Sequence, residues 1–98
     1  MDKLDLEHID EVIHGKIRLG VMAYLSHVNP VPYLELLEKT KATNGNLATH
    51  LKRLEGAGYI KQTKSFRGKR PHTSVSLTAR GRDAWIIYLK EMKRLLEG

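Results

Sequence analysis

The chain has 98 residues, a length that suits one domain, and its 17 Lys and Arg against 11 Asp and Glu give a formal net charge of +6. It contains no cysteine, which excludes disulfides, thiolate metal sites and cysteine nucleophiles, and the cytoplasm is the simplest location to expect. No apolar run reaches the ~18 residues that a membrane helix needs, and the acidic start of the chain is unlike a secretory signal. We therefore expect a single domain over residues 1–98 and no membrane partner.

The charges are unevenly distributed along the chain. The first eleven residues hold five acids against Lys3, whereas residues 41–82 hold ten bases against Glu55 alone, a local charge of +9. Such a concentration of positive charge is expected of a protein that binds a polyanion. The alternative is a solvated basic surface that serves solubility.

Apolar residues in the first third of the chain recur every three or four positions, which predicts N-terminal helices over residues 6–28. These residues are Ile9, Val12, Ile13, Ile17, Val21, Leu25 and Val28. Gly15 either kinks this helix or divides it into a short first helix and a longer second one. The segment Asn29-Pro30-Val31-Pro32 ends it, because proline cannot continue a helix, and Val31 is expected to form a brief strand.

A helix-turn-helix is predicted over residues 33–58. Its first helix covers Tyr33 to Lys39. Thr43 is a suitable N-cap for the second helix, because its hydroxyl can accept a hydrogen bond from a backbone N–H of the first turn. Leucines at one-turn spacing mark the buried face of this second helix, and Gly58 is expected to cap its C-terminus.

A strand pair, Tyr59 to Phe66 and His72 to Leu77, is predicted within a β-wing over residues 59–77. Val75 and Leu77 alternate with serines, so one face of the hairpin is expected to be buried and the other exposed to solvent. The connection Arg67-Gly68-Lys69-Arg70-Pro71 has glycine at its bend. Thr78 then caps a C-terminal helix over residues 78–97.

Polar and basic side chains cover the second helix opposite its leucines and continue along the hairpin. Asn can pair with adenine, Arg with guanine, and Thr can meet a thymine methyl group or a phosphate. Arg at a thin hairpin tip suits a narrow minor groove, and Lys suits phosphates. The candidate DNA-binding residues are Thr43, Asn44, Asn46, Thr49, His50, Arg53, Lys61, Lys64, Arg67, Lys69 and Arg70.

The C-terminal helix carries more apolar residues than one side of a helix can bury, since the side chains of residues 85–89 put apolar surface around most of its circumference. The surplus favours a homodimer in which an N-terminal helix shares the interface. The alternative is that all these residues close the core of a monomer. The candidate interface residues are Ile9, Trp85, Tyr88, Leu89, Met92, Leu95 and Leu96.

No constellation for catalysis or metal binding is apparent. The five histidines have no second ligand at helical spacing, and no serine has a neighbouring His–Asp pattern that would activate it. We therefore expect neither an enzyme nor a cofactor, and the sequence specifies no small-molecule effector.

The run Thr43–Leu54 with Gly58-Tyr59-Ile60, the loop RGKRP and the following SVSLTARGRDAW resemble winged helix-turn-helix transcriptional regulators of the MarR/ArsR-like class, of the short, single-domain DNA-binding type. The resemblance extends from about Ile13 to Leu96. It implies a mainly α fold with a small β-hairpin, in which a three-helix core and a wing are followed by a C-terminal dimerisation helix.

In that class the helix that corresponds to Asn46, Thr49 and Arg53 lies in the major groove. The wing, here Arg67, Lys69 and Arg70, contacts the minor groove or backbone, and terminal helices form a homodimer. The sequence thus predicts a sequence-specific, double-stranded DNA-binding transcriptional regulator. A winged-helix module for protein–protein assembly and a binder of structured RNA are the alternatives.

Overall fold

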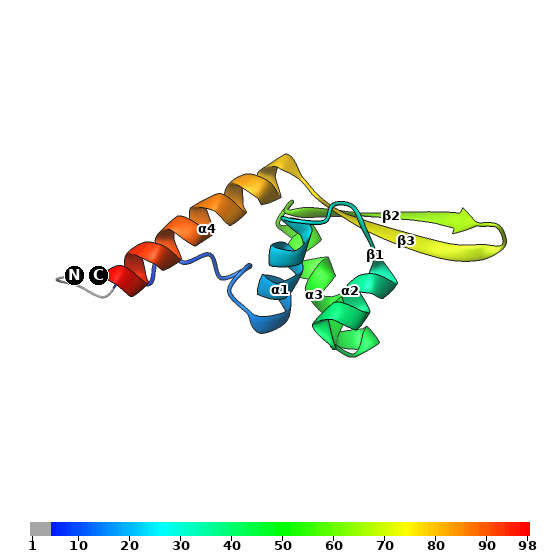
Figure 1. Cartoon of the computed structure of the whole chain (residues 1–98), viewed down its shortest axis with the longest axis horizontal. Coiled ribbons are helices and arrows are strands. Elements are labelled where there is room, and N and C mark those ends of the chain that lie inside the picture. The colour runs from blue at the N-terminus through cyan, green and yellow to red at the C-terminus, as the bar shows by residue number, and fades with distance from the viewer. Residues whose placement is uncertain (1–4) are drawn as a thin grey trace.

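The computed structural model describes residues 5–98 as four helices and a small sheet (Figure 1). The elements in chain order are α1 (Lys16–Leu25), β1 (Val31–Pro32), α2 (Tyr33–Thr40), α3 (Asn44–Gly56), β2 (Ile60–Arg67), β3 (Arg70–Leu77) and α4 (Ala79–Glu97). The order along the chain is that of a three-helix core, a hairpin and a terminal helix, which confirms the predicted winged-helix fold.

The molecule is elongated, with principal extents of 59 × 26 × 21 Å. The β2–β3 hairpin projects from one end and α4 runs toward the other, while α1, α2 and α3 lie together in the middle (Figure 1). The sheet is antiparallel with the order β1-β3-β2. The short strand predicted at Val31 is present, and the structure pairs Val31 with Val75. The hairpin is therefore attached to the helical core only at its base.

The core is formed where the helices meet the base of the hairpin. Helix α3 buries the three leucines predicted to face inward, and the hairpin contributes every second residue of β3 near its end. The fully or nearly fully buried hydrophobic residues are Ile13, Val21, Met22, Leu25, Val31, Leu36, Leu47, Leu51, Leu54, Ile60, Val75, Leu77 and Tyr88.

Both ends of α3 have the caps that the sequence predicted. The Thr43 hydroxyl accepts from the Asn46 N–H at 3.2 Å. At the other end the Gly58 N–H donates to the Glu55 carbonyl and the Tyr59 N–H to the Leu54 carbonyl. This is the Schellman pattern, which requires a left-handed residue, and Gly58 has φ +82°.

The start of α4 is fastened to the start of β2. The Thr78 hydroxyl caps the helix by accepting from the Gly81 N–H at 2.9 Å, as predicted. The Thr78 N–H also donates to the Tyr59 carbonyl at 3.0 Å. The direction in which α4 leaves the core is therefore set by hydrogen bonds to the strand that begins the wing.

The prediction of helix over residues 6–28 is wrong in its first half. Residues 5–15 form turns, helix begins at Lys16, and Val28 lies beyond the end of α1. Asp10 explains the difference, since its carboxylate accepts from the N–H groups of Val12 and Ile13 at 2.8 and 3.2 Å. A side chain that bonds nearby N–H groups offers the backbone an alternative to helix.

Candidate nucleic-acid interface

Helix α3 presents a polar outer surface because its leucines are turned into the core. Thr43, Asn44, Asn46, Thr49 and Arg53 are all exposed. Gly45 has no atoms within 4 Å of the position that a Cβ would occupy, so the surface of the first turn is open at Gly45. The N-terminus of a helix attracts phosphate through its unpaired N–H groups and its dipole, and here that end is open.

In the first half of α3, the side chains of Asn44 and Thr49 already have a partner within the chain. The Tyr33 hydroxyl donates to the side-chain oxygen of Asn44, which leaves the amide NH₂ group of Asn44 to act as a donor. The Thr49 hydroxyl donates to the Gly45 carbonyl at 3.0 Å, so that its oxygen and its methyl group are what remain for a ligand. Both residues are thereby oriented before any ligand binds.

His50 is the candidate that differs most from the others, because it is half-buried against α1. Its Nδ1 lies 2.8 Å from Nη1 of Arg18. A guanidinium has no acceptor, so Nδ1 must accept and the ring proton is on Nε2. Burial, and then the charges of Arg18 and Arg53, lower the pKa of His50, which favours this neutral form.

Arg18 is a functional candidate that the sequence analysis missed. It is buried, and its Nε donates to the Val12 carbonyl at 2.5 Å and its Nη2 to the Glu11 carbonyl at 3.4 Å. One side chain therefore ties the segment before α1 to His50 on α3. The available signal was a single arginine among the apolar residues of α1, at a position that the helical periodicity assigns to the core.

Arg53 lies in the last turn of α3, beside the C-terminal half of α4. With Ile9, His14, Met92 and other residues it lines a depression of about 450 Å³. Lys52, which precedes it, is exposed and was left out of the candidate residues, although the helical wheel places it opposite the leucines. The basic part of α3 is thus its second half, and the neutral polar part is its first.

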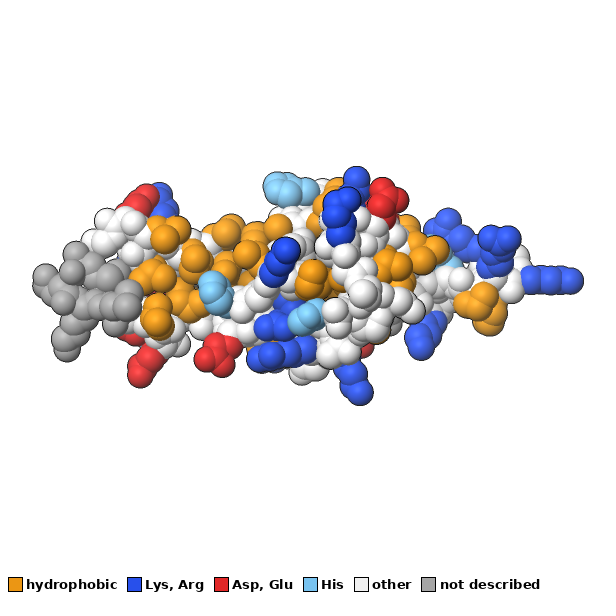
Figure 2. All heavy atoms as spheres, turned by 90° about the horizontal axis from the view of Figure 1, so that it is seen from below, with side chains coloured by type: hydrophobic (Ala, Val, Ile, Leu, Met, Phe, Trp, Pro, Cys, Tyr) orange, Lys and Arg blue, Asp and Glu red, His pale blue; other side chains and the backbone are white. Residues whose placement is uncertain are grey.

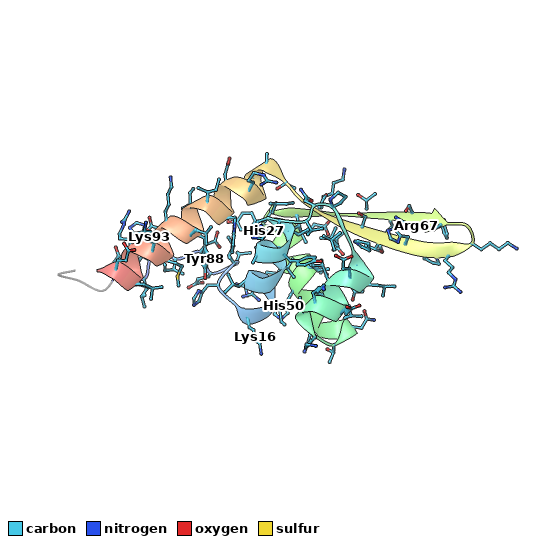
Figure 3. The ribbon with its side chains drawn as sticks, in the orientation of Figure 1. Lys16, His27, His50, Arg67, Tyr88 and Lys93 are labelled. Carbon is cyan, nitrogen blue, oxygen red and sulfur yellow. The ribbon has the colours of Figure 1, made fainter. Side chains whose placement is uncertain are left out.

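The five candidate bases of the wing are all exposed: Lys61, Lys64, Arg67, Lys69 and Arg70. Arg67 and Arg70 are paired across the strands, on either side of the Gly68-Lys69 turn, and Gly68 has φ +64°. Arg67 is near the tip, well beyond the helices (Figure 3). The tip therefore concentrates three cations within four residues of chain.

Glu55 is the acid nearest to this surface in the sequence, and its carboxylate is held at the base of the wing. It accepts from the N–H of Gln62 at 3.0 Å and from the side-chain amide of Gln62 at 3.2 Å. No Asp or Glu occurs from Gly56 to Arg82. Figure 2 shows Lys and Arg side chains over the middle and the wing end of the molecule.

The candidate dimer residues divide into three groups. Leu89 and Leu96 are exposed, and Ile9, Trp85, Met92 and Leu95 are half-buried. Tyr88 was wrongly assigned to this surface, because it is 2% exposed within the single chain. It points from α4 toward the middle of the molecule, where its hydroxyl lies 2.8 Å from Nδ1 of His14 (Figure 3).

Over residues 5–98, no helix is both long and apolar enough to cross a bilayer. Within the same range, no group of three or more His, Asp or Glu side chains could hold a metal ion.

The fold and the sequence both match known winged-helix proteins. The family model of the winged helix DNA-binding domain matches residues 17–96. An uncharacterized protein of Methanocaldococcus jannaschii is 32% identical over 85 residues, which are 87% of this chain and 92% of that protein.

Solved structures give the same result. A transcriptional regulator homologue from Pyrococcus horikoshii OT3 superposes with a TM-score of 0.81 at 29% identity, over 91% of this chain and 88% of its own. A MarR-family regulator from Porphyromonas gingivalis W83 gives 0.67 at 25% identity, over 90% and 85%. The chain therefore belongs to the winged helix DNA-binding domain family, and its fold is that of MarR-family regulators.

Proposed function

We propose that the protein is a sequence-specific, double-stranded DNA-binding transcriptional regulator that acts as a homodimer. The observation that carries this proposal is the pairing of an open, polar and basic outer surface on α3 with a wing that has five exposed bases and no acid. Its relatives from P. horikoshii and P. gingivalis are described as transcriptional regulators, which supports the same role.

In this proposal α3 lies in the major groove of the DNA. The NH₂ group of Asn44 and the open helix N-terminus bind phosphate, which positions the helix. Asn46 and Thr49 meet base edges, where Asn can pair with adenine and the Thr methyl can contact thymine. Arg53 reads guanine, while Lys52 adds a further charge that is free to reach a phosphate.

The wing makes the second contact. Arg67, Lys69 and Arg70 at its tip reach the minor groove or the backbone beside it, because a narrow minor groove has an enhanced negative potential. Lys61 and Lys64, nearer to the core, bind phosphates. These contacts add affinity without reading bases directly.

The exposed apolar side chains of α4 support the homodimer. Leu89 and Leu96 are exposed and lie on one side of α4. This helix extends toward the end of the molecule away from the wing (Figure 1). A two-fold axis through this region would present two copies of α3 to successive turns of the major groove, ~34 Å apart. The operator is then expected to be pseudo-palindromic.

The test is a binding titration over a range of salt concentrations. Selection from a random pool of duplexes supplies the DNA, and an RNA duplex and a scrambled DNA serve as competitors. If a dimer engages four to nine phosphates, the log–log slope of affinity against salt is about −4 to −8. Preference for the selected duplex with such a slope supports the proposal, and weak binding that is insensitive to salt, or equal binding of RNA, rejects it.

A further inference from the structure

Phe66 is a large apolar side chain in an unusual position. It is the one Phe of the chain, it lies directly before Arg67 near the end of β2, and it is 72% exposed. Its partner across the strands is Pro71, which is also exposed. The outer half of the wing, residues 64–73, is otherwise polar or charged, so these two side chains form a small isolated apolar site.

The register of the hairpin determines which way this pair faces. Side chains alternate along a strand, so Phe66 shares a face with Lys64 and Ile60. At the base of the wing this face is buried on the helices through Ile60 and its partner Leu77. Farther out the same face is bare, and Phe66 and Pro71 line an open depression of about 430 Å³ with Lys64, Ser65, His72 and Thr73.

Phe66 and Pro71 continue along the hairpin the face that packs on the helices at its base. Figure 2, seen from below, shows hydrophobic side chains at the wing end, surrounded by Lys and Arg. In the outer half of the wing only Phe66 and Pro71 are hydrophobic. The apolar pair therefore shares its face of the wing with Lys64, to which the proposed function assigns a phosphate contact.

The charges around this pair restrict what can cover it. Lys64, Arg67, Lys69 and Arg70 lie within a few residues, and no acid occurs in the wing. The occupant must be a polyanion that also offers apolar surface between its charges. The minor groove of DNA has this character, because deoxyribose sugars form its walls between two rows of phosphates, and it is about 6 Å wide.

We infer that Phe66, supported by Pro71, is an apolar DNA contact of the wing that packs on minor-groove sugars and wedges at a base step. Apolar side chains inserted in this way partly unstack the bases and bend the duplex toward the major groove. The surrounding cations hold the wing against the phosphates while the ring makes the contact. The inference rests on the proposed function, to which it adds a bend in the DNA.

The experiment compares Phe66→Ala with the unaltered protein on the selected duplex. Loss of the ring contact is expected to weaken binding about tenfold and to reduce the bend, measured by energy transfer between dyes at the two ends of the duplex. The salt slope stays the same, because no phosphate contact is removed. Thr63→Ala changes an exposed side chain on the opposite face of the same strand, outside the depression, and should leave affinity and bend unchanged.

Other results reject the inference. If Phe66→Ala keeps its affinity and bend, the ring does not touch DNA. If it reduces the salt slope together with the affinity, the ring stabilises the hairpin that carries the cations. If Phe66→Ala loses binding to phosphatidylglycerol vesicles while it retains DNA binding, the site is a lipid contact. If the unaltered protein binds no duplex at all, the proposed function fails first and the inference falls with it.

Discussion

At the scale of single residues, the contact with Arg18 determines which nitrogen of His50 can donate a hydrogen bond to a ligand. Because Arg18 can only donate, Nδ1 of His50 accepts and its Nε2 carries the proton. A neutral histidine with a fixed tautomer is a directional donor, unlike a freely titrating one. The charged groups around it are the cations Arg18 and Arg53, and the pKa of His50 is lowered by burial first and then by these two charges.

Replacing Arg18 with Met is expected to raise the NMR titration midpoint of His50 toward the ordinary value of about 6.5. The rise is partial, because burial is the largest cause of the lowered pKa and remains. The variant also loses the hydrogen bonds from Arg18 to the carbonyls of Val12 and Glu11, and it is destabilised by about 1–3 kcal/mol. Lys16→Met, which removes an exposed cation from the same helix, is the control and should leave the midpoint of His50 in place.

The lowered pKa of His50 also fixes the sign of its effect on stability. At a pH above about 6.5, the pKa of histidine in the unfolded protein, His50 is neutral in both the folded and the unfolded protein. The free energy of unfolding then has its full value with respect to this residue. As the pH falls from there through the lower folded value, the unfolded state binds the proton first and stability is lost. Urea unfolding of the unaltered protein and of His50→Gln between pH 7 and 5 measures this loss, which should be smaller in the variant.

Arg53 and Lys64 are expected to differ as DNA contacts. Arg53→Ala should lower the discrimination between selected and random duplexes by about 1–3 kcal/mol, because a guanine contact is lost. Lys64→Ala should weaken both duplexes about equally and reduce the salt slope by about one. Paired titrations on the two duplexes measure both effects. Equal losses on both duplexes for Arg53→Ala would place its guanidinium on the backbone or in the depression beside α4.

At the scale of elements, sequence patterns predicted most of what depends on nearby residues. The caps at Thr43, Gly58 and Thr78, the short strand at Val31 and the hairpin with its alternating faces were all anticipated, because each follows from local backbone chemistry. The spacing of Ile9, Val12 and Ile13 was misread as helical. Ile13 is fully buried and the other two partly, but the backbone that carries them is shaped by Asp10.

What the sequence could not predict are the contacts between distant parts of the chain. Arg18 and His50 are 32 residues apart, and His14 and Tyr88 are 74 apart. The sequence pattern placed His50 among the candidate DNA-binding residues and Tyr88 in a dimer interface. It could not show that α1 would supply a donor to the first, or that the core would enclose the second. Periodicity gives the faces of an element, whereas packing decides what each face meets.

The junction of β2 with α4 makes Gly81 indispensable. A Cβ at Gly81 would lie 2.0 Å from the Tyr59 carbonyl oxygen, so α4 would have to move away from the wing. Gly81→Ala is expected to destabilise the protein by about 1–3 kcal/mol or more in urea unfolding. Gly20→Ala is the matched control, since nothing lies within 4 Å of its Cβ position in α1. It should gain about 0.5–1 kcal/mol through helix propensity.

At the scale of the whole molecule, the proposed DNA contact of the wing and the proposed dimer contact of α4 lie toward opposite ends. The wing and its cations occupy one end, and α4 with its exposed apolar residues extends to the other, over a longest dimension of 59 Å (Figure 1). A dimer formed through α4 would therefore leave both wings unobstructed. In this arrangement one chain supplies half of the DNA contacts, and the affinity for a palindromic site depends on the link between the two chains.

Leu89 provides the test of this link. It is 48% exposed on the side of α4 that also carries Leu96, whereas Ile87, 58% exposed, lies about 160° around the helix. Leu89→Glu should convert the dimer to a monomer in light scattering at micromolar concentration, because a charge would be buried without a partner. Ile87→Glu adds the same charge outside the proposed interface and should remain dimeric.

The same pair of variants connects assembly to DNA binding. A monomer of Leu89→Glu retains one α3 and one wing, so the slope of log affinity against log salt should fall to about half the value of the unaltered protein. Ile87→Glu should keep the full slope. If Leu89→Glu stays dimeric, the chains meet through another surface. If it becomes monomeric with an undiminished slope, one subunit makes all of the phosphate contacts and the two-fold arrangement on DNA is wrong.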